Sequence, residues 1–284
     1  VASLVGSEMC IRDSSLSPKL HNYWIKKNNL NAIYEKKKVE EKDLKKLCDD
    51  VREGKIEGFN VTVPFKEKII KYLDGFTDTA LAVKAVNTVF RKYEDGEYIA
   101  MGDNTDVYGF EQSCPLKNNS KNGASALIVG AGGASKAIIL GLFKLNVKRL
   151  AITNRTREKA EVLMSQIVTP ESFKGHFVYE WCKDEGSMSK PDIVVNCTSL
   201  GLKKEDRIPL DFSKYKKRFF TKKVIFYDLI YNPEETDFLL NAKKIGQQAI
   251  NGKMMFLYQA QKSFTIWHGI KPEINHEVIS LLND

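Results

Sequence analysis

The chain has 284 residues, of which 43% are hydrophobic and 28% are charged, and its formal net charge is +8. This composition is that of a globular protein long enough for two domains, and no apolar run approaches the roughly 20 residues of a membrane-spanning helix. The five cysteines are scattered without a C-x-x-C pair, which excludes a zinc framework and a disulfide scaffold and favours a reducing cytoplasm. The lysines are spread along the chain and form no basic block with aromatics, so we expect neither nucleic acid nor a membrane as partner.

The first residues of the chain differ in character from the rest. Residues 1–13 show no initiator methionine and no clear strand alternation, and they read as translated sequencing adapter. We interpret them as a segment foreign to the protein, standing where a native first strand belongs. After them, Ser17 is predicted to cap a helix with Pro18 at its first position, and residues 42–52 form a second amphipathic helix.

Short strands and turns follow in the rest of the first region. The predicted elements are a strand at 59–63 stopped by Pro64, a helix at 65–73, strands at 85–91 and 98–101 joined by a turn at Asp95-Gly96, and a helix from about Val107. Residues 117–123 are polar and rich in turn formers, which favours a domain linker just before or within them. We therefore expect a first α/β domain over residues 14–110.

The second region repeats strand and helix. Strands are predicted at 126–129, 149–153, 177–180, 192–197 and 223–229, each followed by a helical segment or a turn. This alternation predicts a parallel, doubly wound sheet of the Rossmann type over residues 111–244. Helices at 252–267 and 272–282 have no strand partner in that region, so residues 245–284 are expected to return to the first domain.

A glycine-rich turn is the most informative motif. Gly130-Ala131-Gly132-Gly133-Ala134-Ser135 joins an apolar strand to a helix, the arrangement that places a pyrophosphate on exposed N–H groups at a helix N-terminus. The motif departs from G-x-G-x-x-G at its last position. Asn154-Arg155-Thr156 ends the next strand, where an acidic residue selects NAD. Arg155 instead suits the 2′-phosphate of NADP, and NADP is the cofactor that we expect.

Polar side chains in the first region suit a small anionic substrate. Ser15 and Ser17 precede a helix, where hydroxyls and the helix dipole together favour a carboxylate. Thr62 ends a strand just before Lys66, and the Asp106 carboxylate could pair with that lysine. An ion-paired lysine near a carbonyl can deliver or accept a proton, so this pair is a candidate for acid/base chemistry.

Seven motifs in the same order resemble those of the shikimate dehydrogenase family. They are Ser15-Leu16-Ser17-Pro18 with His21-Asn22, Gly58 to Lys66, Ala85-Val86-Asn87-Thr88, Gly102 to Asp106, Gly130 to Ala134, Asn154-Arg155-Thr156, and Gln259-Ala260. The resemblance covers the chain from about residue 14 to its end. It implies a two-domain enzyme that reduces 3-dehydroshikimate to shikimate with NADPH, on the route to aromatic amino acids.

The resemblance also implies roles for single residues. It implies that Lys66 and Asp106 are catalytic. It implies that the substrate is bound by Ser15, Ser17, Thr62, Asn87, Asp106, Tyr231 and Gln259. It implies that NADP is bound by Gly130, Ala131, Gly132, Gly133, Ala134, Asn154, Arg155, Thr156, Lys159, Leu229 and Gly252. The chain departs from the family pattern at Ser14, where histidine is usual, and at Met254, where glycine is frequent.

Two other functions remain open on the sequence. One is a quinate/shikimate dehydrogenase of broader specificity, whose NAD-using form Arg155 disfavours. The other is a catalytically silent NADPH-binding sensor or scaffold, which would have no need of both Lys66 and Asp106. The few histidines are not clustered, so we expect no metal site, and we expect His21 to be structural. A homodimer is compatible with the sequence.

Overall fold

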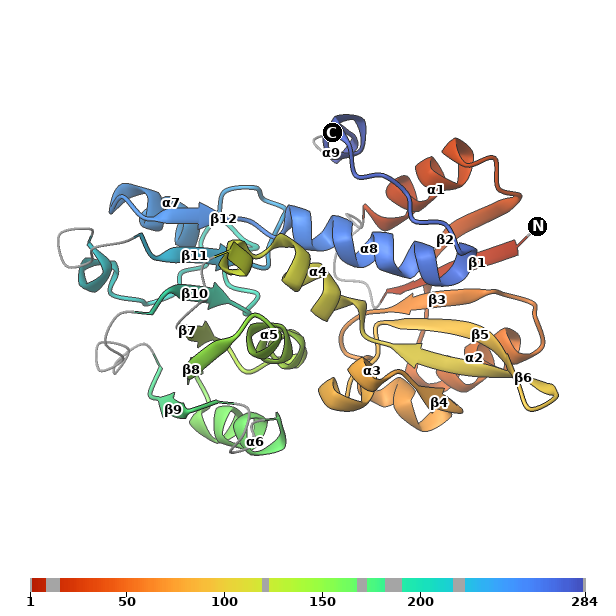
Figure 1. Cartoon of the computed structure of the whole chain (residues 1–284), viewed down its shortest axis with the longest axis horizontal. Coiled ribbons are helices and arrows are strands. Elements are labelled where there is room, and N and C mark those ends of the chain that lie inside the picture. The colour runs from red at the N-terminus through yellow and green to blue at the C-terminus, as the bar shows by residue number, and fades with distance from the viewer. Residues whose placement is uncertain are drawn as a thin grey trace. The chain divides into compact units, whose positions relative to one another are not determined.

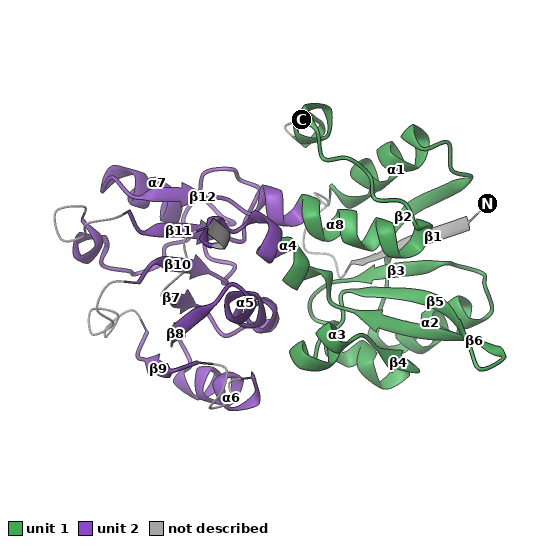
Figure 2. Ribbon diagram, viewed as in Figure 1, with its two compact units in different colours: residues 1–109, 257–284 green, residues 110–256 purple. Residues whose placement is uncertain are grey.

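A computed structural model describes residues 2–8, 16–118, 123–167, 173–181, 191–216 and 223–282, and for 2–8 and 117–118 it describes the backbone alone. The chain divides into two compact units (Figure 2). Unit 1 comprises residues 1–109 and 257–284, and unit 2 comprises residues 110–256. The return to the first unit therefore occurs at Leu257 and not at residue 245, because a short strand after residue 245 still belongs to the second sheet.

Unit 1 is built on a mixed six-stranded sheet with the order β2-β1-β3-β5-β6-β4. Its strands are β1 (Ala2–Glu8), β2 (Ala32–Lys38), β3 (Gly58–Val61), β4 (Gly75–Phe76), β5 (Thr88–Glu94) and β6 (Glu97–Asp103). Its helices are α1 (Ser17–Lys27), α2 (Leu44–Arg52), α3 (Asp78–Val83), most of α8 (Lys253–His268) and α9 (His276–Leu281), with the first turn of α4 (Thr105–Ser113) (Figure 1).

The structure corrects the description of residues 1–13 as lacking a strand. β1 pairs in parallel with β2 on one side and with β3 on the other. A strand between two neighbours has its backbone hydrogen-bonded on both sides and needs no alternation of apolar and polar residues. β2 was not predicted either, since Glu35 to Lys38 gives it an exposed, charged end at the sheet edge. The interpretation of 1–13 as a foreign segment stays a prediction.

Several boundaries differ from the predictions. α1 begins at Ser17, so Leu16 and not Ser17 occupies the cap position, and Pro18 is the second helical residue and not the first. Residues 65–73 form only a short 3₁₀ helix, Lys68–Tyr72. The hairpin at Asp95-Gly96 is confirmed, with positive φ at both residues, as a tight two-residue turn requires.

Successive side chains of β3 point to opposite faces of the sheet, and the two faces differ in polarity. Phe59 and Val61 join an apolar cluster with Leu44, Leu47 and other residues of α2, which confirms the predicted amphipathic helix. Gly58 and Asn60 lie on the opposite face, where the Trp267 ring of α8 leaves no room for a Cβ at residue 58. Helix α8 therefore packs against the sheet of unit 1, as predicted for the end of the chain.

Unit 2 is a parallel sheet with the order β12-β11-β10-β7-β8-β9, which confirms the doubly wound fold. Its strands are β7 (Ala124–Val129), β8 (Val147–Thr153), β9 (Gly175–Tyr179), β10 (Ile193–Asn196), β11 (Ile225–Asp228) and β12 (Gln248–Ile250). Its helices include α5 (Gly133–Lys144), α6 (Arg157–Ile167) and α7 (Asp237–Lys244). The strand order reverses between β7 and β10, the position at which such sheets bind ligands.

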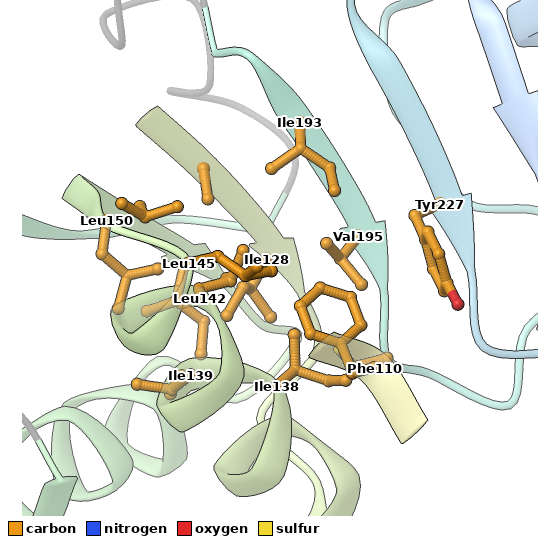
Figure 3. Close-up of a cluster of buried hydrophobic side chains, with 14 of the residues drawn as sticks. Phe110, Ile128, Ile138, Ile139, Leu142, Leu145, Leu150, Ile193, Val195 and Tyr227 are labelled. Carbon is orange, nitrogen blue, oxygen red and sulfur yellow. The ribbon is translucent and has the colours of Figure 1, made fainter. Parts of the chain in front are cut away.

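Both faces of the second sheet are covered. Ile128 of β7 packs with Phe110 and Ile138 in one apolar cluster (Figure 3). Leu127 of the same strand packs with Phe238 in the other cluster. Burial on both sides explains the unbroken apolar run that precedes the glycine turn and holds the end of β7 in one position.

Among the described residues, no helix combines the length and the apolar character that crossing a membrane requires.

Candidate active site

Lys66 and Asp106 form the central ion pair of unit 1. The ammonium Nζ lies 2.6 Å from Asp106 Oδ2, and the two side chains are only 16% and 14% exposed. Lys66 follows β3, and its carbonyl accepts a hydrogen bond from the Val86 N–H, while Asp106 lies in the first turn of α4. The predicted pairing is confirmed by this geometry. Because the pair is partly shielded from water, its electrostatic interaction is stronger than that of a surface pair.

Asn87 fixes the second oxygen of the carboxylate. Its Nδ2 donates to Asp106 Oδ1 at 2.9 Å, and its Oδ1 accepts from the Thr105 backbone N–H at 2.8 Å. A backbone N–H can only donate, so it fixes which end of the amide is oxygen. Asp106 is therefore held from one side by Lys66 and from the other by Asn87, and its orientation is defined before a substrate binds.

A set of buried polar side chains surrounds Asn87. Asn60 Nδ2 donates to the Asn87 carbonyl at 3.1 Å, and its Oδ1 accepts from the Tyr34 hydroxyl at 2.9 Å. Ser263 of α8 lies 2.8 Å from the Thr88 hydroxyl. Polar groups at this depth stay bonded because leaving them unpaired costs free energy.

The other residues expected to bind substrate are spread over both units. Thr62 follows β3, and Gln259 on α8 lies with its Oε1 3.5 Å from the Thr105 hydroxyl, so Gln259 joins the group around Asn87. Ser17 opens α1. Ser15 lies outside the described residues. Tyr231 belongs to unit 2, where its ring stacks on Phe256 at 4.7 Å.

His21 is structural, as expected. It is 1% exposed and stacks on Tyr34, with ring centroids 4.3 Å apart. Burial, with a smaller contribution from His268, lowers the pKa of His21 to about 3, so the ring is neutral at pH 7. Its neighbour Asn22 bonds the backbone of Tyr34 at both N–H and carbonyl, which ties α1 to β2.

The glycine turn of unit 2 leaves open space at the start of α5. Gly130 has a φ of +104°, and a Cβ there would lie 2.6 Å from the Thr198 side chain. A Cβ on Gly132 or Gly133 would meet nothing within 4 Å, and Gly132 caps α5 without a side-chain bond. Free N–H groups at an uncapped helix end with open space before them suit a phosphate. Ser135, at the departing position, donates to the Gly130 carbonyl at 2.8 Å and so braces the turn.

Asn154 links this turn to the end of β8. Its Oδ1 accepts from the Ala131 N–H at 3.1 Å, and its Nδ2 donates to the Thr156 carbonyl at 2.6 Å. Ala131 is half-buried, and Ala134 lies in the first turn of α5. The structure therefore joins the segment that was expected to hold the pyrophosphate of NADP to the segment that was expected to hold its 2′-phosphate.

The side chains expected at the 2′-phosphate are exposed. Arg155, Thr156 and Lys159 lie just before or within the first turn of α6, and all three reach solvent. In contrast, Arg157 is engaged by Glu161 at 2.8 Å. Two cations and a hydroxyl at the end of the second parallel strand suit an anion on the adenosine ribose.

Leu229 and Gly252 are in direct contact in unit 2. A Cβ at Gly252 would lie 2.1 Å from the Leu229 carbonyl oxygen, and its N–H donates to the Ile230 carbonyl at 3.0 Å. The structure thus brings together two residues that are 23 positions apart and that the family resemblance implies for the nicotinamide side of the cofactor. Lys253 forms an ion pair with Glu234, which ties the same two segments together.

Asp228 is a residue that the sequence interpretation missed. It ends β11, is 0% exposed, and accepts from Asn196 Nδ2, the Ile230 N–H and the Thr236 hydroxyl. Burial raises its pKa to about 6, although these three donors favour the charged form. The carboxylate organises the segment that carries Leu229. The sequence did contain a usable indication of this role, because Asp228 is an acidic residue at the end of an apolar strand.

The described residues contain no group of histidine, cysteine and acidic side chains that could hold a metal ion. Cys48, Cys114 and Cys197 are free and buried, and burial raises the pKa of each thiol. Protonated, buried thiols are poor nucleophiles, so none of these three is a candidate for covalent catalysis.

Thr88 and Ser263 are further residues that were not assigned to the site from sequence, and Asn60 was expected only to share a strand face with Thr62, without a role of its own. Asn60 is a polar position in the otherwise apolar strand β3, Thr88 is the first residue of β5, and Ser263 lies one helical turn after Gln259. These sequence positions could have indicated that the three side chains belong near the site. Their convergence depends on helix α8 crossing a sheet formed some 170 residues earlier, which no local pattern contains.

Two family models match the chain. The shikimate dehydrogenase substrate binding domain matches residues 9–89, and the shikimate / quinate 5-dehydrogenase model matches residues 115–201. The shikimate dehydrogenase (NADP(+)) of Pelagibacter ubique is 44% identical over 269 residues, which is 95% of this chain and 94% of the relative.

Solved structures agree with the sequence matches. The crystal structure of shikimate dehydrogenase from Aquifex aeolicus superposes with a TM-score of 0.82 at 36% identity, covering 99% of this chain and 97% of the other. A shikimate dehydrogenase solved in complex with NADP⁺ gives a TM-score of 0.84 at 33% identity, covering 100% of this chain and 95% of the other. The similarity therefore extends over both units.

Proposed function

Because the chain belongs to the shikimate dehydrogenase family, we propose that it catalyses the reversible, NADP-dependent interconversion of 3-dehydroshikimate and shikimate, on the route to aromatic amino acids. The observation within this chain that carries the proposal is the Lys66–Asp106 pair, with Asn87 on the second carboxylate oxygen. A sensor or scaffold would not need a shielded cation and anion held in contact. The pair therefore favours an enzyme.

Lys66 is the proposed acid/base group. Its Nζ gives a proton to the substrate oxygen when the ring carbonyl is reduced, and it takes that proton back in the reverse direction. Asp106 orients the ammonium and accepts a hydrogen bond from a ring hydroxyl. Since Asn87 holds the other carboxylate oxygen, Asp106 keeps this orientation while the proton moves.

The remaining contacts to the substrate are proposed from the family pattern. Ser15, Ser17 and Tyr231 bind the carboxylate, and Thr62, Asn87 and Gln259 bind ring hydroxyls. Hydroxyls and amides that are held by buried partners penalise analogues lacking a ring hydroxyl, because a polar group of the site would then be left unpaired.

NADP fits the open turn and the exposed cations of unit 2. When bound, it supplies or accepts the hydride. Gly130 to Ala134 would hold the pyrophosphate and Leu229 with Gly252 the nicotinamide side. The adenosine 2′-phosphate would be held by Asn154, Arg155, Thr156 and Lys159.

A steady-state assay tests the proposal. Purified protein is mixed with shikimate and NADP⁺, and the appearance of NADPH is followed by its absorbance; NAD⁺ and quinate replace either component in parallel reactions. We expect turnover with shikimate and NADP⁺ and a much lower kcat/KM with NAD⁺. Quinate turnover equal to that of shikimate would favour the broader enzyme, and no turnover with either acid would refute the assignment.

We further propose a cytoplasmic location, which suits the free thiols of the described cysteines. A homodimer is a separate proposal, and light scattering on the eluting protein gives its mass directly.

A further inference from the structure

Asn196 is a buried amide at the end of β10, and it bonds two different segments of unit 2. Its side chain is 0% exposed. Oδ1 accepts from the Thr198 backbone N–H at 3.0 Å and from the Thr198 hydroxyl at 2.7 Å. Nδ2 donates to the Leu200 carbonyl at 3.1 Å and to Asp228 Oδ1 at 3.0 Å. Because a backbone N–H can only donate, the bond from Thr198 fixes which end of the amide is oxygen.

The oxygen end of Asn196 closes a loop that lies against the glycine turn. It holds Thr198 at two atoms, and the Thr198 hydroxyl in turn accepts from the Leu200 N–H at 3.0 Å. A Cβ on Gly130 would lie 2.6 Å from the Thr198 methyl carbon, so this side chain packs directly on the first glycine of the turn. The position of Thr198 therefore supports the turn that is proposed to hold the pyrophosphate.

The nitrogen end of Asn196 reaches a second segment through Asp228. Asp228 Oδ1 accepts from Asn196 and from the Ile230 N–H, both at 3.0 Å, and Oδ2 accepts from the Thr236 hydroxyl at 2.6 Å. In the described part of the chain, all three of these partners donate to Asp228, which suits an ionised carboxylate. Asp228 is therefore held by Asn196 on β10 and by the start of α7, and it passes this position on to Ile230.

The bond from Ile230 sets the peptide between Leu229 and Ile230. The N–H and C=O groups of a trans peptide point in opposite directions, so an N–H that faces Asp228 turns the Leu229 carbonyl away from it. That carbonyl lies against Gly252, where a Cβ would be 2.1 Å from its oxygen. The Gly252 N–H donates to the Ile230 carbonyl at 3.0 Å. Asp228 thus fixes the contact between the two residues proposed for the nicotinamide side.

We propose that Asn196 is a positioning residue for the cofactor: its oxygen holds the loop beneath the glycine turn, and its nitrogen holds the carboxylate that orients Leu229 against Gly252. One amide then sets the proposed pyrophosphate segment and the proposed nicotinamide segment relative to each other within unit 2. The inference rests on the proposed function and adds to it the residues that preorganise the cofactor site. Asn196 acts through its bonded partners, because it is itself fully buried.

Two ligands separate the two ends of the amide. NADP⁺ spans both segments, whereas adenosine 2′-phosphate 5′-diphosphate carries the 2′-phosphate and a diphosphate but no nicotinamide. We call the second ligand the phosphate fragment. The binding of each is measured by isothermal titration calorimetry on the whole chain without substrate, so the readout does not depend on turnover.

Asn196→Leu tests both ends together, since leucine is of similar size and has no polar atoms. We expect the Kd for the phosphate fragment to rise about 3- to 10-fold, the effect of one neutral hydrogen bond, because Thr198 is released. The Kd for NADP⁺ should rise by a larger factor, because Asp228 also loses a donor. Circular dichroism checks folding, and Asn196→Ala gives the same readouts if the leucine variant does not fold.

Asp228→Leu tests the nitrogen end alone, because the bonds between Asn196 and Thr198 remain. We expect the Kd for NADP⁺ to rise about 3- to 10-fold and that for the phosphate fragment to change by less than about twofold. Asp228→Asn is the conservative variant. Its Oδ1 still accepts from Asn196 and Ile230 while its NH₂ group donates to the Thr236 oxygen, so it restores the wild-type Kd for NADP⁺.

Gln247→Met is the matched control, since it removes another buried amide of unit 2. Gln247 is 5% exposed, its Nε2 donates to the Tyr215 carbonyl at 2.5 Å, and its Oε1 accepts from the Val224 N–H at 2.8 Å. Val224 precedes β11, whereas Asp228 ends it, so the control lies at the opposite end of the strand. Both Kd values should stay within about twofold of the wild type, below the effect of one hydrogen bond.

Four results would overturn the inference in a chain that binds NADP⁺. They are an unchanged Kd for either ligand in Asn196→Leu, an equal effect on both ligands in Asp228→Leu, no recovery in Asp228→Asn, or the same losses in Gln247→Met. Absence of NADP⁺ binding or of shikimate turnover in the wild-type chain refutes the proposed function instead, so the two failures are distinguishable.

Discussion

Replacing Lys66 by alanine tests the acid/base assignment most directly. Lys66 Nζ and Asp106 Oδ2 are 2.6 Å apart, and neither side chain is more than 16% exposed, so bulk water has little access to take over the proton transfer. Removing a positioned proton donor costs about 10²- to 10⁴-fold in rate. Because the proton moves in the transition state, we expect Lys66→Ala to lower kcat by that factor with little change in KM for shikimate.

Asp106→Asn has a different expected signature. The change removes the charge that orients Lys66 and also the acceptor proposed for a ring hydroxyl. We therefore expect kcat to fall and KM for shikimate to rise. The double variant Lys66→Ala, Asp106→Asn should be no slower than the worse single variant, because the two side chains act as one unit.

The assay is the initial rate of NADPH formation over a range of shikimate concentrations, with each variant checked for folding. Lys46→Ala is the matched control, since Lys46 pairs with Asp50 at 2.9 Å in the same unit and that carboxylate is 12% exposed. The control should keep the wild-type kcat. A Lys66→Ala enzyme with near-normal kcat would remove Lys66 from the mechanism and leave the proton donor unidentified.

Three further predictions concern the cofactor, pH and the start of the chain. Arg155→Ala should weaken NADPH binding by about 1.5–3 kcal/mol, the worth of a hydrogen bond to a charged group, with NADH binding nearly unchanged in a fluorescence titration; an equal loss for both would contradict the assignment. Asp228 has a pKa raised from 3.8 to about 6, so its contribution to the free energy of unfolding is lost as pH rises from about 4 to above 6, by about 3 kcal/mol at 1.36 kcal/mol per unit. Asp228→Asn should abolish this difference in urea unfolding at the two pH values, whereas an unchanged pH dependence would place the group nearer solvent. Deleting residues 1–13 should lower the melting temperature, because β1 pairs with both β2 and β3; an unchanged value would support a segment without structural function, and N-terminal sequencing of the natural protein tests whether it is foreign.

Local sequence signals were sufficient for much of unit 2. An apolar run followed by glycines and a helical pattern predicts strand, turn and helix because each is dictated by neighbouring residues, and the sheet order confirms the doubly wound fold. β12 was not predicted, because it has only three residues, Gln248–Ile250, and forms through pairing with β11. Arg155 was identified for the same local reason, since it ends the strand that follows the glycine turn.

Unit 1 depended more on contacts between distant segments. β1 and β2 are held by parallel pairing whose partners lie far along the chain, so their own composition was a poor guide. The pairing of Lys66 with Asp106 could be guessed from two motifs, but its distance and shielding could not. Buried Asp228 was missed because its raised pKa comes from the loss of water around it, which is a property of the packed sheet.

The sequence by itself determined the class of fold, the glycine-rich turn between β7 and α5 and the residue types proposed for proton transfer, because these depend on neighbouring residues and on spacing along one element. Only the tertiary structure decided which amide faces which partner around Asn87. The hydrogen bonds of a hydroxyl or an amide depend on which partners packing brings within about 3 Å. Here helix α8 brings Ser263 and Gln259 close to residues that lie far earlier in the chain.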